Sequence, residues 1–198
     1  LSKLIRDHSY WMSRNISIGT IEKFEGGVVK VGRMANRYVF PIFNYKKEFI
    51  GVSGRYIGEL PNEKTPKWKH IGDKSEWKYP LQINNKTIRK IKETILVESI
   101  GDMLSLWEAG IKNVIVIFGL QISLSIINYL LRIDAQKIYI ALNNDQENNS
   151  AGNKAAFKNE KRLLKYFDPH QIHVVFPTKK DFGEMSSKEI QEWHQKEI

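Results

Sequence analysis

The fold of this chain is decided by TILVESIGDMLSLWEAGIKNVIVIFG, residues 94–119, and by KIYIALNND, residues 137–145. Each stretch begins with a short apolar run that is typical of a buried strand. Gly110 ends the helix that the first stretch predicts between two strands. Strands and helices alternate in this way from about residue 87 onward, up to a last helix that Ser186 or Ser187 caps. This alternation predicts an α/β subdomain with a mainly parallel central sheet.

Acidic side chains follow the predicted strands at the points where the strands end. Glu98 follows the first strand. The second apolar run is followed by Asn143, Asn144 and Asp145, and Asp181 follows the strand IHVVFP. Because the carboxyl ends of parallel strands meet at one edge of a sheet, we expect these side chains to lie close together. Grouped carboxylates repel one another unless a cation is present, and Mg²⁺ binds one or two carboxylates with phosphate oxygens and water. The alternative is that each acid is an ordinary charge near a helix N-terminus.

The first half of the chain is predicted to be a different kind of subdomain. Residues 28–60 contain short β-rich runs separated by turn residues, which indicates antiparallel strands. Helices are predicted over residues 1–25, and a turn-rich loop over residues 61–86. We therefore expect an α+β subdomain over residues 1–88, followed by the α/β subdomain over residues 89–198.

The composition excludes several classes of protein. The 198 residues include no cysteine, which rules out a disulfide framework and a thiolate metal site. The most apolar run has the length of a strand and not of a membrane span. There is no basic segment followed by an apolar one, as a secretory signal has. We expect a cytoplasmic protein that has no membrane partner.

The charge pattern points to a nucleic acid. The formal net charge is +9. Many of the basic residues lie in the first half of the chain, where aromatic residues alternate with them. Phosphates attract lysine and arginine while bases stack on aromatic rings, so this pattern suits a single strand. A solvated, lysine-rich surface is the alternative. The basic and aromatic candidates are Arg33, Arg37, Arg55, Lys67, Trp68 and Lys78.

The order of these motifs resembles the TOPRIM domain that DnaG-type primases share with topoisomerases. The family pattern is a strand, Glu-Gly-x-x-Asp, a helix ending in Gly-Ile, and a later strand ending in Asp-x-Asp. The first half is similar to the basic subdomain of bacterial and phage primases. RYVFPIF, residues 37–43, matches its R-x-x-FPI motif, GVSGR, residues 51–55, its Gly-rich hairpin and GGR, and PKW, residues 66–68, its PKY. The resemblance covers nearly the whole chain.

The resemblance implies a role for each matching residue. Glu98 matches the family's acid–base or metal-organising glutamate, and Asp102 the second acid of Glu-Gly-x-x-Asp. Both are implied to be catalytic. Arg55 and Lys67 match basic residues that hold nucleotide phosphates or template, and Lys78 falls near a third such position. The implied ligands of Mg²⁺, or of Mn²⁺, are Glu98, Asn143, Asp145 and Asp181.

Several positions depart from the family pattern, among them Trp68 in place of the tyrosine of PKY. Ser99 stands where the family has the glycine of Glu-Gly, and Asn143 replaces the first aspartate of Asp-x-Asp. Asparagine offers a neutral oxygen to a cation but adds no charge, which weakens the binding of Mg²⁺.

The resemblance implies a primase catalytic core in a bacterium or a phage-infected cell. Such a core joins ribonucleoside triphosphates into a short RNA primer on single-stranded DNA, by magnesium-dependent nucleotidyl transfer, and works with a replicative helicase. One alternative is a module of weak or no activity that binds a single strand, such as the front half of a primase–helicase. A second is a TOPRIM nuclease, against which the FPI and GGR motifs argue.

Overall fold

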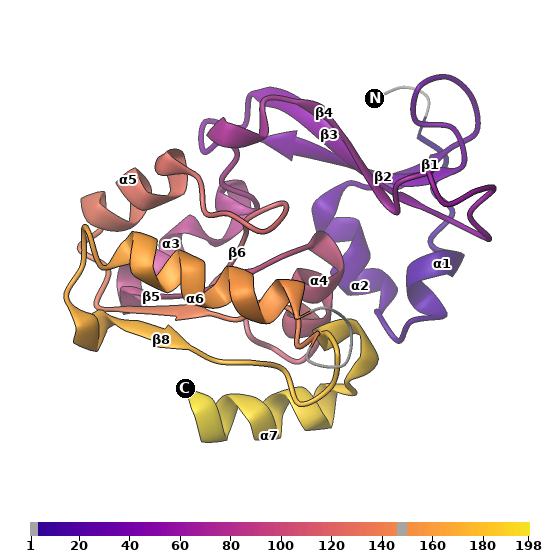
Figure 1. Cartoon of the computed structure of the whole chain (residues 1–198). Helices are drawn as coiled ribbons and strands as arrows, with labels where there is room; N and C mark the ends of the chain where they lie inside the picture. The colour runs from indigo at the N-terminus through magenta and orange to yellow at the C-terminus, as the bar shows by residue number, and fades with distance from the viewer. Residues whose placement is uncertain (1–3, 146–149) are drawn as a thin grey trace. The chain divides into compact units, whose positions relative to one another are not determined.

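The computed structural model describes residues 4–145 and 150–198. The chain divides into two compact units, residues 1–74 and residues 75–198. The first unit is built on an antiparallel sheet and the second on a parallel one (Figure 1). The predicted combination of an α+β part with an α/β part is therefore confirmed.

The sheet of the first unit runs in the order β1-β2-β3-β4. Its core is aromatic, because the ring centroids of Trp11, Tyr38 and Phe40 lie between 5.0 and 6.1 Å apart. The hydroxyl of Tyr38 lies 2.7 Å from Nδ1 of His8, which pairs a buried polar group. The elements are α1 (Ser9–Met12), α2 (Ile18–Ile21), η1 (Glu22–Phe24), β1 (Gly27–Val29), β2 (Arg37–Phe43), β3 (Phe49–Tyr56) and β4 (Trp68–Gly72).

The start of the chain is less helical than the sequence predicted. Ile5 forms an antiparallel bridge with Val28, and the two helices before residue 22 have only four residues each. Asp7 accepts hydrogen bonds from the backbone and hydroxyl of Ser9, and the left-handed backbone of Asn15 follows soon after the first helix. Such local bonds and turns compete with a long helix. Residues 1–3 of the predicted helix lie outside the described residues.

The second unit contains four parallel strands in the order β6-β5-β7-β8. No helix within the described ranges of the chain is long and apolar enough to cross a membrane. The elements are η2 (Lys74–Glu76), α3 (Leu81–Ile91), β5 (Glu93–Val97), α4 (Ile100–Glu108), β6 (Val114–Val116), α5 (Leu124–Arg132), β7 (Lys137–Ile140), α6 (Ala151–Leu163), η3 (Pro169–Gln171), β8 (Ile172–Val174), η4 (Phe182–Glu184) and α7 (Ser187–Glu197).

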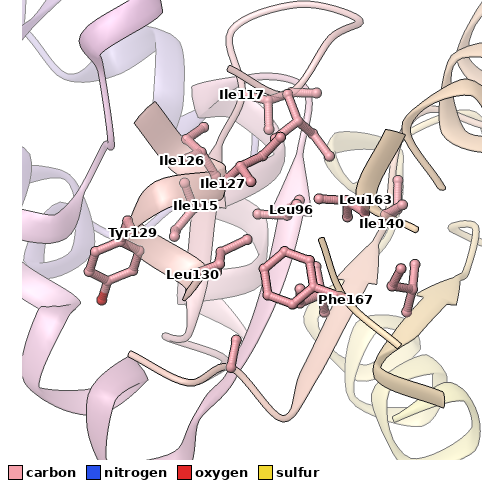
Figure 2. Close-up of a cluster of buried hydrophobic side chains, with 14 of the residues drawn as sticks. Leu96, Ile115, Ile117, Ile126, Ile127, Tyr129, Leu130, Ile140, Leu163 and Phe167 are labelled. Carbon is pink, nitrogen blue, oxygen red and sulfur yellow. The ribbon is translucent and has the colours of Figure 1, made fainter. Parts of the chain in front are cut away.

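The parallel sheet is held by a core of aliphatic side chains. Leu96, Ile115 and Ile140 come from three neighbouring strands and are fully buried, as are Ile127 of α5 and Leu163 of α6 (Figure 2). Burying each such side chain contributes about 1.5–3 kcal/mol to stability relative to leaving it in water. A sheet packed in this way is rigid, so it fixes the positions of the residues that follow its strands.

The segment predicted as a loop over residues 61–86 contains a strand and the start of a helix. Its last part belongs to the second unit, because the backbone of Tyr79 bridges Val116 and the carbonyl of Tyr79 accepts a hydrogen bond from it. Asn84 is buried and donates to the carbonyls of Lys112 and Val114. These contacts place the division between the units after Lys74, earlier than the boundary expected after residue 88.

Candidate functional site

The predicted acidic edge follows from the order of the strands. β5 and β7 are neighbours, with Leu96 opposite Ile140, and β7 pairs in turn with β8. All three strands point the same way, so Glu98, Asp145 and Asp181 follow strands that end at one edge of the sheet. Sequence reasoning placed these acids together correctly because strand direction alone brings them there.

The electrostatics of Glu98 show how closely the acids are grouped. Burial is the largest cause that raises the pKa of Glu98, to about 7. The charges of Asp102, Asp145 and Asp181 raise it further, in that order. Four carboxyl groups from three strand ends and one helix therefore interact at this edge. A carboxyl whose pKa is close to neutral can exchange a proton under working conditions.

Asp102 has a structural task as well as a place in this cluster. It is 4% exposed, and its Oδ2 accepts hydrogen bonds from the backbone of Ser99 at 3.1 Å and from its hydroxyl at 2.7 Å. The amide of Phe182 also donates to it. Burial and Asp181 raise the pKa of Asp102 to about 6, although these hydrogen bonds oppose the rise. Asp102 thus ties the start of α4 to the loop that contains Asp181.

Ser99 is compatible with the position where the family pattern has glycine. Its backbone is extended, with φ −131° and ψ 164°, so a side chain causes no strain there. Its hydroxyl accepts a hydrogen bond from the amide of Asp102 and completes a capping box at the start of α4. The substitution therefore keeps the helix start on which Glu98 depends.

The segment after β7 is held by α6. The side chain of Asn153 accepts a hydrogen bond from the amide of Asp145 at 2.9 Å and donates to Asn144 at 3.1 Å. The amide of Gly152 lies 3.3 Å from Oδ2 of Asp145, and a Cβ at Gly152 would clash with the carbonyl oxygen of Asn143. Sequence reasoning missed Asn153 and Gly152, because nothing in a helical pattern marks a residue that bonds backward to a preceding loop.

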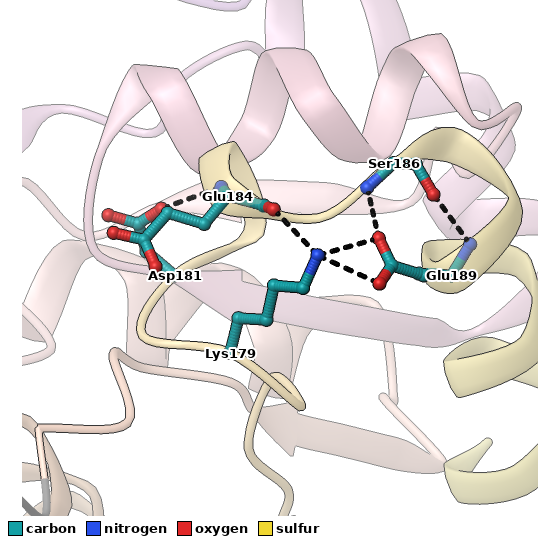
Figure 3. A network of polar contacts seen from close by, with 5 residues as sticks. All are labelled: Lys179, Asp181, Glu184, Ser186 and Glu189. Atoms are coloured by element: carbon teal, nitrogen blue, oxygen red, sulfur yellow. Dashed lines mark hydrogen bonds and ion pairs between the residues drawn. The ribbon is translucent and has the colours of Figure 1, made fainter.

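Asp181 begins the short helix η4, where its Oδ1 accepts a hydrogen bond from the amide of Glu184 at 3.1 Å (Figure 3). Lys179 lies on the other side of this turn and binds Glu189, with Nζ 2.8 Å from Oε1. The same ammonium donates to the carbonyl of Glu184. The turn that contains Asp181 is therefore fixed from both sides, and Lys179 is paired with an acid outside the cluster.

The donors at this edge suit a hard divalent cation. Every side chain in question offers oxygen: Glu98, Asp145 and Asp181 as carboxylates and Asn143 as a half-buried amide. Burial first and then the neighbouring carboxylates raise the pKa of Glu98, so a cation at this edge would favour its charged form. Within residues 4–145 and 150–198, no three acidic or histidine side chains already converge as metal ligands. The chemistry of these oxygen donors fits Mg²⁺, which keeps water and substrate phosphates among its ligands.

The raised pKa values predict how stability depends on pH. Folding raises the pKa of Glu98 and Asp102, so the folded state binds these protons more tightly than the unfolded state. Their stabilising contribution is present in full below about pH 4 and is lost as pH rises through 6 to 7. Without divalent cations, we expect the free energy of unfolding to fall by about 1 kcal/mol between about pH 5 and 8. This corresponds to a fall in Tm of about 2–4 °C.

Differential scanning calorimetry of the wild type and Glu98→Gln checks this expectation. The amide cannot ionise, so the variant should show a smaller fall in Tm across the same range and should be the more stable protein at about pH 8. An identical fall in the two proteins would mean that other groups cause it.

Arg37 does not have the exposed position that a phosphate-binding residue needs. Its side chain is 4% exposed, and its guanidinium donates to the backbone carbonyls of Gly54, Pro66 and Lys67 at 2.8–3.2 Å. It also lies 5.2 Å from the ring centroid of Tyr56. This placement argues against the nucleic-acid contact predicted for Arg37, which instead fastens the segment before β4 to the sheet.

The other predicted contacts in the first unit remain accessible. Arg33 and Lys67 are exposed. Arg55 and Trp68 are half-buried partners in β3 and β4, with the guanidinium 6.0 Å from a ring centroid of Trp68. Nε of Arg55 donates to the hydroxyl of Tyr10 at 3.0 Å, which orients the guanidinium. These residues combine cations with an aromatic ring, although the ring of Trp68 is itself stacked with that of Trp11, at 6.3 Å between centroids.

Lys78 belongs to the second unit and is half-buried there. Its ammonium donates to the hydroxyl of Ser125 and to the carbonyl of Glu76. Burial lowers its pKa, while Glu76 opposes this change. The structure therefore holds Lys78 in place with two polar partners.

Comparison with known proteins agrees with these features. The Toprim-like family matches residues 95–186. The chain is 33% identical over 123 residues to a DNA primase of Geobacillus stearothermophilus, covering 60% of this chain and 20% of that primase. Its fold is similar to the zinc-binding and RNA polymerase domains of the Aquifex aeolicus primase, with a TM-score of 0.78 and 23% identity over 98% of this chain and 56% of the other. It is also similar to a DnaG primase catalytic domain that was solved bound to single-stranded DNA. That match has a TM-score of 0.76 and 19% sequence identity, and it covers 96% of this chain and 71% of the other. The chain thus spans about a fifth of that curated primase.

Proposed function

We propose that this chain, which contains a Toprim-like domain and has the fold of a primase RNA polymerase domain, is the catalytic core of a DNA primase. It joins ribonucleoside triphosphates into a short RNA primer on single-stranded DNA during replication. In this role it acts in the cytoplasm of a bacterial or phage-infected cell, beside a replicative helicase.

One observation supports this proposal above the others. Glu98 has a pKa near neutrality and lies among three further carboxyl groups at the edge where β5, β7 and β8 end. The residues that match the Toprim-like family include all four of these acids. An acidic edge of this kind repels a nucleotide unless cations neutralise it, which is the setting that nucleotidyl transfer needs.

The chain's own residues have distinct tasks in the proposed reaction. Glu98, Asp145 and Asp181, with Asn143, hold Mg²⁺ or Mn²⁺, which when bound neutralises the phosphates and lowers the pKa of the attacking hydroxyl. Glu98 accepts the proton of the 3′-hydroxyl of the growing primer. The oxygen of that hydroxyl bonds to the α-phosphorus of the incoming triphosphate, and the bond from this phosphorus to pyrophosphate breaks. Asp102 positions the start of α4 and the loop of Asp181.

The first unit supplies the template contacts in this proposal. Arg33, Arg55 and Lys67 offer cations to the phosphates, and the half-buried ring of Trp68, which is stacked with Trp11, offers its exposed part to a base. A domain of the same fold was solved bound to single-stranded DNA, which supports this assignment. Lys78 is proposed to contact nucleotide phosphate from the second unit.

Primer synthesis tests the proposal directly. The full chain is incubated with an unlabelled single-stranded DNA template, labelled ribonucleoside triphosphates and Mg²⁺ or Mn²⁺, and the products are separated by size. Template-dependent dinucleotides and longer RNA support the proposal. Nicking of a supercoiled plasmid without any RNA product would favour a nuclease instead.

A binding module without synthesis is the second candidate, and Asn143 favours it. A neutral amide in place of a carboxylate weakens the attraction for a cation. If the site is active but weakened, Asn143→Asp should lower the Mg²⁺ concentration that gives half-maximal synthesis by about tenfold. Titration of Mg²⁺ against primer yield measures this shift. Asn85→Asp on α3 is the control, since Oδ1 of Asn85 accepts a hydrogen bond from the hydroxyl of Tyr129, which a carboxylate can also accept. A shift that is as large in the control would contradict the assignment.

A further inference from the structure

The exposed face of α6 carries a row of basic side chains that the proposed site does not use. Lys154, Lys158 and Lys161 recur at every third or fourth residue of the helix, and Lys165 continues the row just beyond its end. All four are exposed. At about 1.5 Å of rise per residue, the row extends over roughly 16 Å on one side of the helix, which is orange in Figure 1.

A hollow lies beside this row. Its volume is about 540 Å³, and α6 and the loop before α5 line it. Arg162 reaches into it with a buried Nε that has no hydrogen-bond partner among the described residues. The remaining wall is partly apolar, from Leu120 and Ala155.

The hollow is built on a fixed scaffold. The buried side chain of Asn159 accepts a hydrogen bond from the amide of Ile122 at 3.0 Å and donates to the carbonyl of Leu120 at 2.9 Å. These two bonds fasten the loop to α6. The neighbouring core residues Ala156 and Leu163 hold the helix to the sheet. The basic row therefore lies on a surface that is already ordered before any ligand binds.

The lysines of this face repel one another. Like charges three or four residues apart destabilise a helix by about 0.2–0.5 kcal/mol for each pair. Glu160 is the one acid in the sequence of α6. A single phosphate would meet only one or two of the lysines, whereas a chain of phosphates can meet them all.

An aromatic ring accompanies the row. Phe157 is 51% exposed and, at about 100° per residue, lies on the flank of the lysines opposite to Arg162. Its ring packs edge-to-face with that of Phe176, at 6.1 Å between ring centroids, and this contact orients it. A linear series of cations with an adjacent aromatic face is what an unpaired nucleic-acid strand needs.

We propose that this face of α6 is a second binding track for single-stranded nucleic acid, separate from the acidic edge and from the contacts of the first unit. The phosphates lie along Lys154, Lys158, Lys161 and Lys165, with Arg162 contacting one phosphate from the hollow, and Phe157 stacks on a base. The proposal does not depend on catalysis, because binding alone tests it.

The test measures the affinity of the full chain for a labelled oligothymidylate by fluorescence anisotropy at several salt concentrations. We expect Lys158→Ala/Lys161→Ala to bind about tenfold more weakly at about 0.1 M salt and to lower the slope of log K against log salt by about 1.4, since each phosphate contact contributes about 0.7. Phe157→Leu should weaken binding about fivefold without changing that slope.

Lys86→Ala/Lys90→Ala is the matched control, because it removes two exposed lysines one helical turn apart on α3. This control should bind like the wild type. Equal affinities of the α6 variant and the wild type would overturn the proposal, and so would an equal loss in the control. A loss seen with ATP alone but not with the oligonucleotide would also overturn it, in favour of a nucleotide site. Primer synthesis is not the readout, so failure here is distinct from failure of the proposed function.

Discussion

Replacing Glu98 with glutamine is expected to reduce primer synthesis by about 10²–10⁴-fold. The amide keeps the size of the side chain but can neither accept the proton of the 3′-hydroxyl nor contribute charge to a cation site. Because Asp102, Asp145 and Asp181 all raise the pKa of Glu98, loss of its charge also weakens the hold of the whole cluster on a cation. Initial rates of dinucleotide formation at saturating nucleotide measure the effect.

Glu93→Gln is the control for this substitution. Glu93 begins the same strand, at the end away from the acidic edge, and pairs with Lys137 at 3.5 Å on a partly exposed surface. Such surface pairs contribute about 0–1 kcal/mol to stability, so the control should fold and should synthesise primer at nearly the rate of the wild type. If Glu98→Gln were as active as Glu93→Gln, the catalytic role assigned to Glu98 would be wrong.

Replacing Arg37 with alanine is expected to lower the free energy of unfolding by about 2–4 kcal/mol, because three backbone carbonyls lose a charged donor inside the protein. These carbonyls belong to Gly54, Pro66 and Lys67, so the substitution releases the segment before β4 from the sheet. Urea denaturation followed by tryptophan fluorescence measures the loss, since Trp11 and Trp68 stack in the same unit.

Arg33→Ala separates this structural role from phosphate binding. Arg33 is exposed, so its loss should leave the free energy of unfolding within about 0.5 kcal/mol of the wild type while weakening the binding of single-stranded DNA. Arg37→Ala should show the opposite pattern, with a lower free energy of unfolding. Without urea, at a temperature where it remains folded, it should bind single-stranded DNA as the wild type does. Unchanged stability of Arg37→Ala would contradict the role that its hydrogen bonds indicate.

The second half of the fold was predictable because its pattern is local. Apolar runs that end in Glu98 and in Asn143–Asp145 identify strands, and parallel strands bring their carboxyl ends to one edge without any further information. The first half was harder. The helix expected at the start is shortened by bonds between Asp7 and Ser9, and the segment expected as a loop is ordered by the pairing of Tyr79 with Val116. These interactions join residues whose meeting no periodicity shows.

The sequence predicts which acids lie at the site, but it does not predict their burial or their hydrogen-bond partners. The sequence identifies Glu98 and Asp102, but the capping box that occupies Asp102 and the burial that raises both pKa values emerge only from packing. An arginine next to a tyrosine in a strand is expected at the surface, and Arg37 is buried because backbone carbonyls 17 to 30 residues away converge on it. The motif match predicted a nucleic-acid contact for this position, whereas its buried hydrogen bonds indicate a structural role.

We propose that Glu98 and Asp145 share a divalent cation. Anomalous diffraction from crystals soaked in Mn²⁺ tests this proposal most directly. We expect a peak at the edge where β5 and β7 end, about 2.0–2.3 Å from a carboxylate oxygen of each residue, and absent from crystals of Asp145→Ala. Crystals of the wild type that show no peak there at saturating Mn²⁺, or a peak that persists in Asp145→Ala, would contradict the account.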